Sequence, residues 1–243
     1  MRPAQPDFLN EARVYVKNGK NNLSNCSIYD NKSKHGGGIH AKNTSYLNIN
    51  LSTFSENFAS GDGGAIKMDN SGLFFTTDSL IIKNSEILNN DARNGGALYI
   101  KETNHVKIKN NLILSNTSTW DGEFFGGAFH LKECPDVIID HVTVHGNGNL
   151  EVDSWGGSIY LSGGTLNLTN SIFWNNMAEN SPEWQITSGN INASFSIVTE
   201  DEDCEPECIH DGPIFDDDHG LIDGSPGKNA GNDGTDMGYS HEE

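Results

Sequence analysis

The chain has 243 residues, a formal net charge of −19 at pH 7 and only 35% hydrophobic residues. This length fits one substantial domain, and the composition excludes a bulky core of long amphipathic helices. The negative charge repels nucleic acid and anionic membrane surfaces, so we expect neither as a partner.

No apolar stretch approaches the roughly 18 residues that a membrane span needs. The first residues are not followed by the apolar run of a signal peptide. We therefore expect a soluble chain without direct membrane insertion. A secreted or cell-surface parent protein would carry its signal and its anchor outside this chain.

Residues 1–20 lack the repeat and are expected to form an N-terminal extension or cap. From residue 21 to residue 198, two motifs recur in phase about every 30 residues. The first begins at a glycine pair: GGGIHAK at 36, GGAIKMD at 63, GGALYIK at 95, GGAFHLK at 126 and GGSIYLS at 156. The second ends in Asn: LSNCSIYDN at 23, INLSTFSEN at 49, IKNSEILNN at 82, IKNNLILSN at 108, IDHVTVHGN at 139 and LTNSIFWNN at 168. Two motifs in lockstep indicate a solenoid.

Apolar residues alternate in short runs within each repeat, and no helical periodicity persists. The pattern predicts an all-β parallel β-helix of about six to seven coils, with three short strands per repeat and turns at Gly, Asn and Asp. Equivalent inward residues should stack as columns. One column is Ile39, Ile66, Leu98, Phe129 and Ile159, beside Ala41, Met68, Ile100, Leu131 and Leu161; another is Ile28, Phe54, Ile87, Ile113, Val144 and Phe173.

Two columns of Asn occupy the predicted corners. The first column is Asn31, Asn57, Asn90, Asn116, Asn147 and Asn176; the second is Asn25, Asn84, Asn110 and Asn170, interrupted by Leu51 and His141. Stacked amides can donate to one coil and accept from the next, which satisfies turn backbone. We therefore interpret these Asn residues as structural rather than sugar-binding.

The period is lost after residue 198, and residues 199–243 are expected to form an acidic, loop-rich C-terminal cap. Its acidic runs EDEDCEPEC (200–208) and FDDDHG (215–220) could hold Ca²⁺, although neither matches a calcium-loop motif. A solvated acidic surface is the alternative, so no cofactor is required and no metal site is identified. Cys204 and Cys208 lack the second pair of a zinc site, and a local disulfide between them stays open.

The GGAI and FSEN motifs resemble the GGA[ILV] and FxxN repeats of chlamydial polymorphic outer-membrane proteins and other bacterial surface β-helix proteins. The segment GPIFDDDHGLIDGSPGKNAGNDGTDMG (212–238) resembles the end of bacterial choice-of-anchor Q domain proteins. These resemblances imply a right-handed parallel β-helix at a cell surface. They are specific for the fold but not for the function, because such proteins include adhesins and polysaccharide lyases.

The first candidate site is the outward column beside the glycine pairs: His40, Lys67, Tyr99, His130 and Tyr160, flanked by Lys42, Asp69, Lys101, Lys132 and Ser162. On one sheet face, these groups could bind a polyanionic sugar or abstract a proton next to a uronate carboxylate. A plain solvated strand face is the alternative interpretation.

The second candidate site is the set of loops before the glycine pairs. These loops should align Trp120, Asp121, Glu123, Phe124, Asp153 and Trp155 along one edge. Aromatic rings with neighbouring carboxylates could grip a sugar or hold Ca²⁺. Alternatively, the rings only pack the loops onto the wall of the β-helix.

We therefore expect a non-enzymatic extracellular module, adhesin-like or carbohydrate-binding, whose partner is a glycan or another cell-surface ligand. No catalytic residue is assigned. One alternative is a polysaccharide lyase acting on a uronate-containing glycan. Another is a structural subunit that assembles end to end into a homo-oligomeric filament, which stacked coils would favour.

Overall fold

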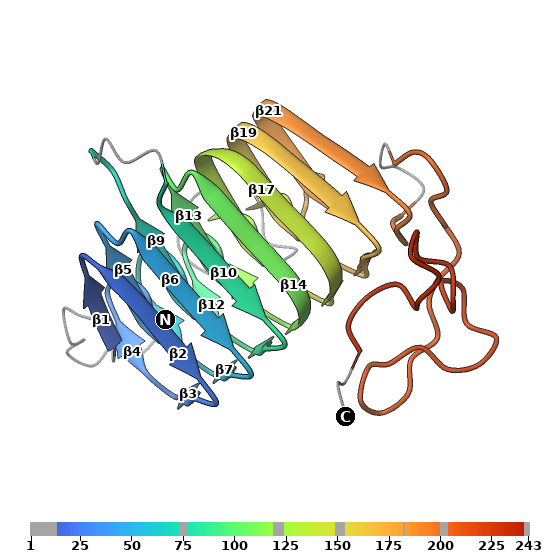
Figure 1. The fold of residues 1–243 in the computed structure, drawn as a ribbon, viewed down its shortest axis with the longest axis horizontal. Coiled ribbons are helices and arrows are strands. Elements are labelled where there is room, and N and C mark those ends of the chain that lie inside the picture. The colour runs from blue at the N-terminus through green and yellow to red at the C-terminus, as the bar shows by residue number, and fades with distance from the viewer. Residues whose placement is uncertain are drawn as a thin grey trace.

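The computed structural model describes residues 14–72, 77–118, 124–148, 154–181, 183–199 and 204–240. The described chain is all-β and winds into a stack of coils (Figure 1). All pairings between its named strands are parallel, and each strand pairs with its equivalent one repeat away. The predicted parallel β-helix is confirmed.

The coils have three main faces. The first follows the glycine pairs and contains β1 (Val14–Lys17), β5 (Ile39–Lys42), β9 (Ile66–Asp69), β13 (Leu98–Lys101) and the starts of β17 (Phe129–His145), β19 (Ile159–Thr169) and β21 (Trp184–Ser194). The second contains β2 (Lys20–Ser24), β6 (Tyr46–Asn50), β10 (Ser79–Lys83), the start of β14 (His105–Leu114) and later parts of β17, β19 and β21. The third contains β3 (Ser27–Tyr29), β7 (Thr53–Ser55), β11 (Glu86–Leu88), the ends of β14 and β17, and β20 (Ile172–Trp174).

Shorter strands complete each coil between the third face and the next glycine pair. They are β4 (Lys32–Ser33), β8 (Phe58–Ala59), β12 (Asp91–Ala92), β15 (Thr117–Ser118), β16 (Phe124–Phe125) and β18 (Ser154–Trp155). The described repeats therefore contain a short strand in addition to the three separate strands that were expected. In later coils β14 and β17 run through corners without a break, because single residues with positive φ turn the chain: Asn110 in β14, and Glu133 and His141 in β17.

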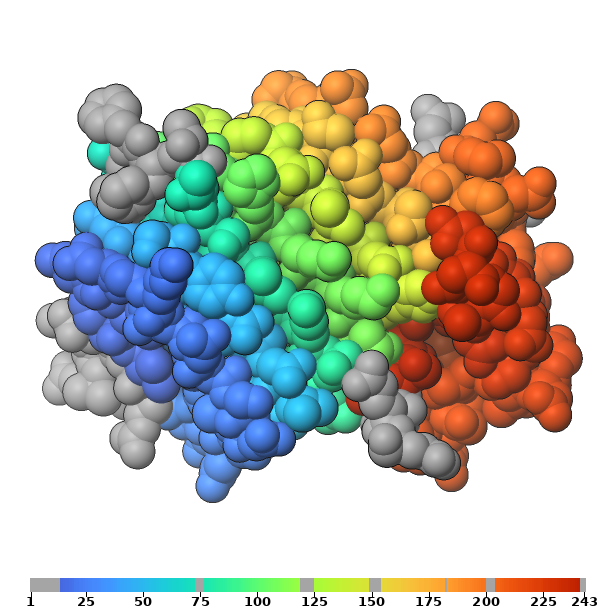
Figure 2. Space-filling model, in the orientation of Figure 1, coloured from blue at the N-terminus to red at the C-terminus, as the bar shows by residue number. Residues whose placement is uncertain are grey.

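The described coils begin earlier than residue 21, where the repeats were expected to start. Strand β1, which lies within the segment 1–20, already pairs with β5. The described β-helix therefore begins by Val14. The chain from residue 204 to residue 240 has no named strand and packs against the later coils (Figures 1 and 2). Its Leu221 and Met237 form a small apolar cluster with Ile172 and Ile197 of the β-helix. We call this segment, residues 204–240, the cap.

The predicted inward columns are confirmed as the core. Leu98 lies in register between Ile66 and Phe129, and all three side chains have no exposed area. Ile87 lies between Phe54 and Ile113 on the third face and is equally buried. Each such side chain contributes about 1.5–3 kcal/mol through the apolar surface that it removes from water.

The first Asn column forms a continuous hydrogen-bonded ladder. The Nδ2 of Asn90 donates to the Oδ1 of Asn116 at 2.9 Å, and Asn116 donates to Asn147 at 2.9 Å. The same amides also donate to backbone carbonyls, as Asn116 does to the oxygen of Ile87. Every step points toward the C-terminus, so the last amide needs an acceptor, which Asn176 finds in the buried carboxylate of Glu183 at 2.7 Å.

The second Asn column shares a backbone conformation. Its residues all have φ between 48° and 54°, and Leu51 and His141 adopt the same conformation at the positions where Asn is absent. Asn tolerates this left-handed region better than other non-glycine residues, which explains its recurrence. The interruptions therefore change the side chain but not the corner.

The two glycines of each pair serve different purposes. Gly95 has a φ of 61°, which lets the chain turn. Gly96 lies so close to the next coil that an added Cβ would stand 2.3 Å from the carbonyl oxygens of Gly127 and Thr117. The first glycine thus supplies a conformation and the second supplies space.

Of the cysteines, Cys204 and Cys208 form a disulfide at the start of the cap, which settles the pairing that the sequence left open. Cys26 and Cys134 are free thiols.

Replacing Asn116 with Ala should lower the free energy of unfolding by about 2–3 kcal/mol, because buried partners in two adjacent coils lose their hydrogen bonds. Urea denaturation measures the loss. The matched control is Asn48→Ala on the second face, where the amide makes one exposed bond to Asn22. Equal effects of the two substitutions would contradict a structural role for the buried ladder.

Candidate functional site

The glycine corner folds each residue that precedes it over the first face. Because Gly126 turns the chain with a φ of 66°, the ring of Phe125 comes to lie 6.0 Å from that of His130, five residues later. The same geometry recurs in the other coils and creates two parallel rows. The edge row is His35, Asp62, Asn94, Phe125 and Trp155; the face row is His40, Lys67, Tyr99, His130 and Tyr160.

The rows contact each other through aromatic rings in the later coils. The ring of His130 lies between those of Tyr99 and Tyr160, with centroids 4.8 and 4.9 Å away. Phe125 of the edge row closes over this group, 4.4 Å from Tyr160 and 6.0 Å from His130. His130 is consequently only 7% exposed, while both tyrosines are half-buried.

Charged groups join the two rows in the earlier coils. The Nζ of Lys67 lies 2.7 Å from a carboxylate oxygen of Asp62 and 3.3 Å from the Nδ1 of His35. The same ammonium lies 5.2 Å from the ring centre of Tyr99, within cation–π range. Asn94 donates to the other oxygen of Asp62 at 2.9 Å. Lys67 is therefore buried, and its positive charge is balanced by the Asp62 carboxylate and the Tyr99 ring.

Burial sets the protonation states of the face row. It lowers the pKa of His130 to about 4, and it lowers the pKa of His40 to about 4 with help from the nearby Lys67 charge. Burial also raises the pKa of the Tyr99 phenol well above its ordinary value, and Asp62 and Asp69 add to this effect. Burial alone would raise the pKa of Asp62, but Lys67 holds it below its usual range. At neutral pH both imidazoles and the phenol are therefore uncharged.

Two lysines border the face row on the same side of the sheet. Lys101 and Lys132 occupy neighbouring positions on β13 and β17, two residues beyond Tyr99 and His130. The Nζ of Lys101 pairs with Glu102 at 3.2 Å. Lys132 makes no ion pair with any described residue and is only half-buried. It is thus a cation open to a ligand beside the aromatic group.

Trp155, a described residue of the second predicted site, therefore lies in the edge row beside the first predicted site. Tyr99, His130, Tyr160, Lys101 and Lys132 share the first face as expected, and Trp155 pairs with Phe125 along the predicted edge. Of the other predicted edge residues, Trp120, Asp121, Glu123 and Asp153 lie outside the described residues. Lys67 and His130 of the expected outward column are buried, because the edge row covers them, so a plain solvated strand face does not describe these two positions.

Sequence reasoning singled out the loops before the glycine pairs but did not name Asp62, Phe125 or His35 as members of the site. Their shared signal was present, since each directly precedes a glycine pair. Finding it requires knowing that the glycine turns the chain back over its own strand, which depends on the positive φ at that residue.

Metal and membrane features are absent from the part of the chain that the structure describes. It holds no group of three or more His, Cys, Asp or Glu side chains that could bind a metal ion. In the acidic tail, Asp216 instead accepts hydrogen bonds from the backbone amides of Asp218 and Gly220. No helix of the described chain is long and apolar enough to cross a membrane.

Comparison with known families agrees with this architecture. A family model described as the right handed beta helix region matches residues 12–204. The chain belongs to this family. No match was found among curated proteins, and none among solved structures. Membership of the right-handed β-helix family accounts for the fold and leaves the ligand to be argued from the site.

His130 should make the protein less stable in acid. An imidazole with an ordinary pKa of 6.5 that titrates at about 4 when folded opposes folding as the pH falls from 6.5 toward 4. Between pH 7.5 and 4.5 the wild type should therefore lose about 2–3 kcal/mol more than His130→Phe, at about 1.4 kcal/mol per pKa unit. Urea denaturation at both pH values measures the difference.

The control for this prediction is His105→Phe, at a histidine whose side chain is 56% exposed. It should follow the wild type. If His130→Phe lost as much stability in acid as the wild type, the neutral, buried state of His130 would be wrong.

Proposed function

We propose that this right-handed β-helix is a non-enzymatic extracellular module that binds a carbohydrate along the first face. The observation that carries the proposal is the row of Tyr99, His130 and Tyr160 beside the lysines Lys101 and Lys132. Half-buried tyrosine rings offer apolar surface and a hydroxyl, a combination that suits the carbon–hydrogen faces and hydroxyl groups of a sugar.

The repeat supports a polymer as the ligand. Equivalent positions recur once per coil, about 4.8 Å apart along the axis. A glycan chain laid along this axis would therefore meet similar groups at regular intervals. The adjacent lysines favour an anionic glycan, such as one that contains uronate, because an ammonium pairs well with a carboxylate.

Binding is better supported than lyase chemistry. A lyase needs a base to remove the proton beside the carboxylate, with a pKa near the working pH. The Tyr99 phenol is held un-ionised, and Lys67 is committed to Asp62. His130 is neutral, but it is enclosed by three aromatic rings. These groups are better suited to stacking and hydrogen bonding than to proton transfer.

A location outside the cell is part of the proposal. The resemblance of the GGA[ILV] and FxxN motifs to bacterial surface β-helix proteins supports a secreted or cell-surface protein with an adhesin-like role. The net charge of −19 suits an exposed, highly solvated molecule.

Substituting both Tyr99 and Tyr160 with Ala should weaken glycan binding at least about tenfold, because each ring contributes roughly 1 kcal/mol of contact. A glycan array that includes uronate polymers, repeated with a chelator, identifies the ligand and any need for calcium. Titration calorimetry then measures the affinity. The matched control is Tyr46→Ala, a half-buried tyrosine on the second face.

Three outcomes separate the possibilities. Loss of binding in Trp155→Ala with full binding in the double tyrosine variant would move the site to the edge row. Ultraviolet absorbance from an unsaturated product would establish the lyase instead. Unchanged binding in all variants would remove the first face from consideration.

A further inference from the structure

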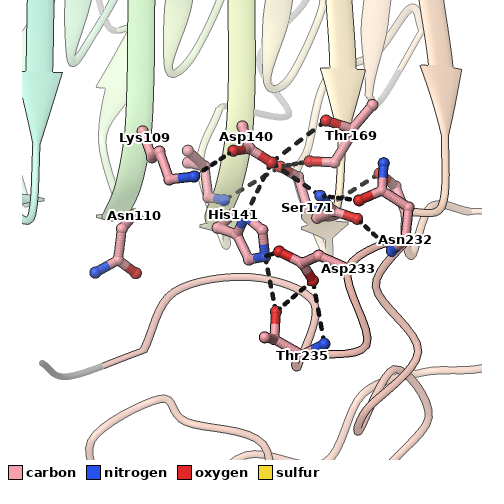
Figure 3. Close-up of polar contacts among 12 residues, drawn as sticks. Lys109, Asn110, Asp140, His141, Thr169, Ser171, Asn232, Asp233 and Thr235 are labelled. Carbon is pink, nitrogen blue, oxygen red and sulfur yellow. Dashed lines mark hydrogen bonds and ion pairs between the residues drawn. The ribbon is translucent and has the colours of Figure 1, made fainter.

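His141 breaks the second Asn column at the place where the cap meets the β-helix. The preceding corner has Asn110 and the following corner has Asn170, and all three residues share the left-handed conformation. Here the chain keeps the corner but replaces an amide with an imidazole. Figure 3 shows this imidazole between Asp140 on β17 and the cap residues Asp233 and Thr235.

Both nitrogens of His141 face hydrogen-bond acceptors. The Nδ1 lies 2.8 Å from an Asp140 carboxylate oxygen. The Nε2 lies 3.0 Å from the Thr235 hydroxyl and 3.4 Å from an Asp233 carboxylate oxygen. The Thr235 hydroxyl already donates its hydrogen to Asp233 at 2.7 Å, so it can only accept from the imidazole. In this arrangement both ring nitrogens carry hydrogen, which is the imidazolium form.

The surrounding charges favour this protonated form. From the β-helix, Asp140 and Lys109 face the ring, and the Lys109 Nζ lies 2.8 Å from the second Asp140 oxygen. From the cap, Asp233 faces it directly, while Asp236 lines the same groove and pairs with Lys228 at 2.8 Å. Strand β19 and the corner after it contribute only the neutral Thr169 and Asn170, which donate to Asp140. Two carboxylates thus bracket the imidazolium, with one lysine offset by Asp140.

The pKa values agree with this geometry. The hydrogen bond to Asp140 raises the pKa of His141 above its ordinary 6.5, and Asp233 adds to the effect. Burial opposes ionisation of Asp140, but its bonds to His141, Lys109 and Asn170 hold its pKa far below the usual value. The hydrogen bonds from Thr235 likewise lower the pKa of Asp233. Above about pH 4 both carboxylates therefore stay ionised.

Other contacts hold the neighbouring parts of the cap without titrating. Asn232 and Asn170 exchange two hydrogen bonds, at 2.8 and 3.1 Å. Ser240 and Asn110 exchange two more. Between these anchors, residues 233–236 line a polar groove of about 480 Å³ together with Lys109 and His141. The imidazole is the contact of this loop whose strength depends on a proton near neutral pH.

We propose that His141 is a proton-operated clasp, which fastens the loop of residues 233–236 to the β-helix when the imidazole is protonated and loosens this loop when the proton is lost. The sign follows from the raised pKa: the contribution is complete below pH 6.5 and disappears as the pH rises through the folded-state value. The cap is therefore held most firmly in mild acid, between about pH 4 and pH 6.5.

Hydrogen exchange of the intact chain tests the clasp. Protection of amides in residues 229–240, normalised to the unfolded chain at each pH, should be at least about threefold higher at pH 5.5 than at pH 8.0. His141→Asn is the matched variant, because Asn occupies the equivalent corners and tolerates the same φ. It should show the same protection at both pH values. His105→Asn, which removes an exposed histidine paired with Asp136, should behave like the wild type.

A second measurement keeps the test independent of the folding of one variant. The imidazole proton resonances of His141 should titrate above 6.5 in the wild type and at a lower pH in Asp233→Asn. Protection that is independent of pH in the wild type, or a pH dependence that survives in His141→Asn, would overturn the clasp. A His141 titration at or below 6.5 in the wild type would also overturn it.

Discussion

A coil that turns sharply several times must satisfy the buried amides and carbonyls of its corners, and the remainder of this fold depends on how that is done. The ladder from Asn31 to Asn176 meets the requirement by linking each corner to the next coil. It also fixes the register, because each amide fits only when equivalent residues lie opposite each other. Once the register is fixed, apolar side chains align into a core and polar side chains align into surface rows.

This dependence explains which features could be predicted from the sequence. The columns around Leu98 and Ile87 were predictable, because parallel stacking places equivalent residues one above another and burial alternates along each strand. The course of the chain at the glycine corner was not, because it depends on a backbone angle at Gly95. That corner brings the edge row over the face row. The alternation of side chains along a strand therefore does not by itself predict that Lys67 and His130 are buried.

For the cap, the sequence predicted only where the repeats end. Its residues follow no period, so nothing in the sequence indicates that Asp233 meets His141, a residue 92 positions earlier. The break in the second Asn column indicated that the corner at His141 differs from the others, but it did not identify the residue that His141 contacts. The structure supplies the partner and gives a reason for the exception.

Two histidines of this chain respond to acid in opposite directions. His130 lies among aromatic rings that cannot stabilise a proton, whereas His141 lies between carboxylates that can. Acid therefore acts against the aromatic group on the first face and in favour of the contact between the β-helix and its cap. The balance between the two depends on their surroundings, since both side chains have the same ordinary pKa.

All hydrogen bonds of the Asn ladder point in the same direction, and this affects how coils can be added to or removed from the β-helix. Each interior rung has the same donor on one side and the same acceptor on the other, so a duplicated or deleted coil would leave matching ends that rejoin. Only the end of the series differs, because there a carboxyl oxygen of Glu183 accepts the hydrogen bond of the last amide. Lengthening by gene duplication is therefore compatible with the buried polar chemistry of the interior, provided that this terminus is retained.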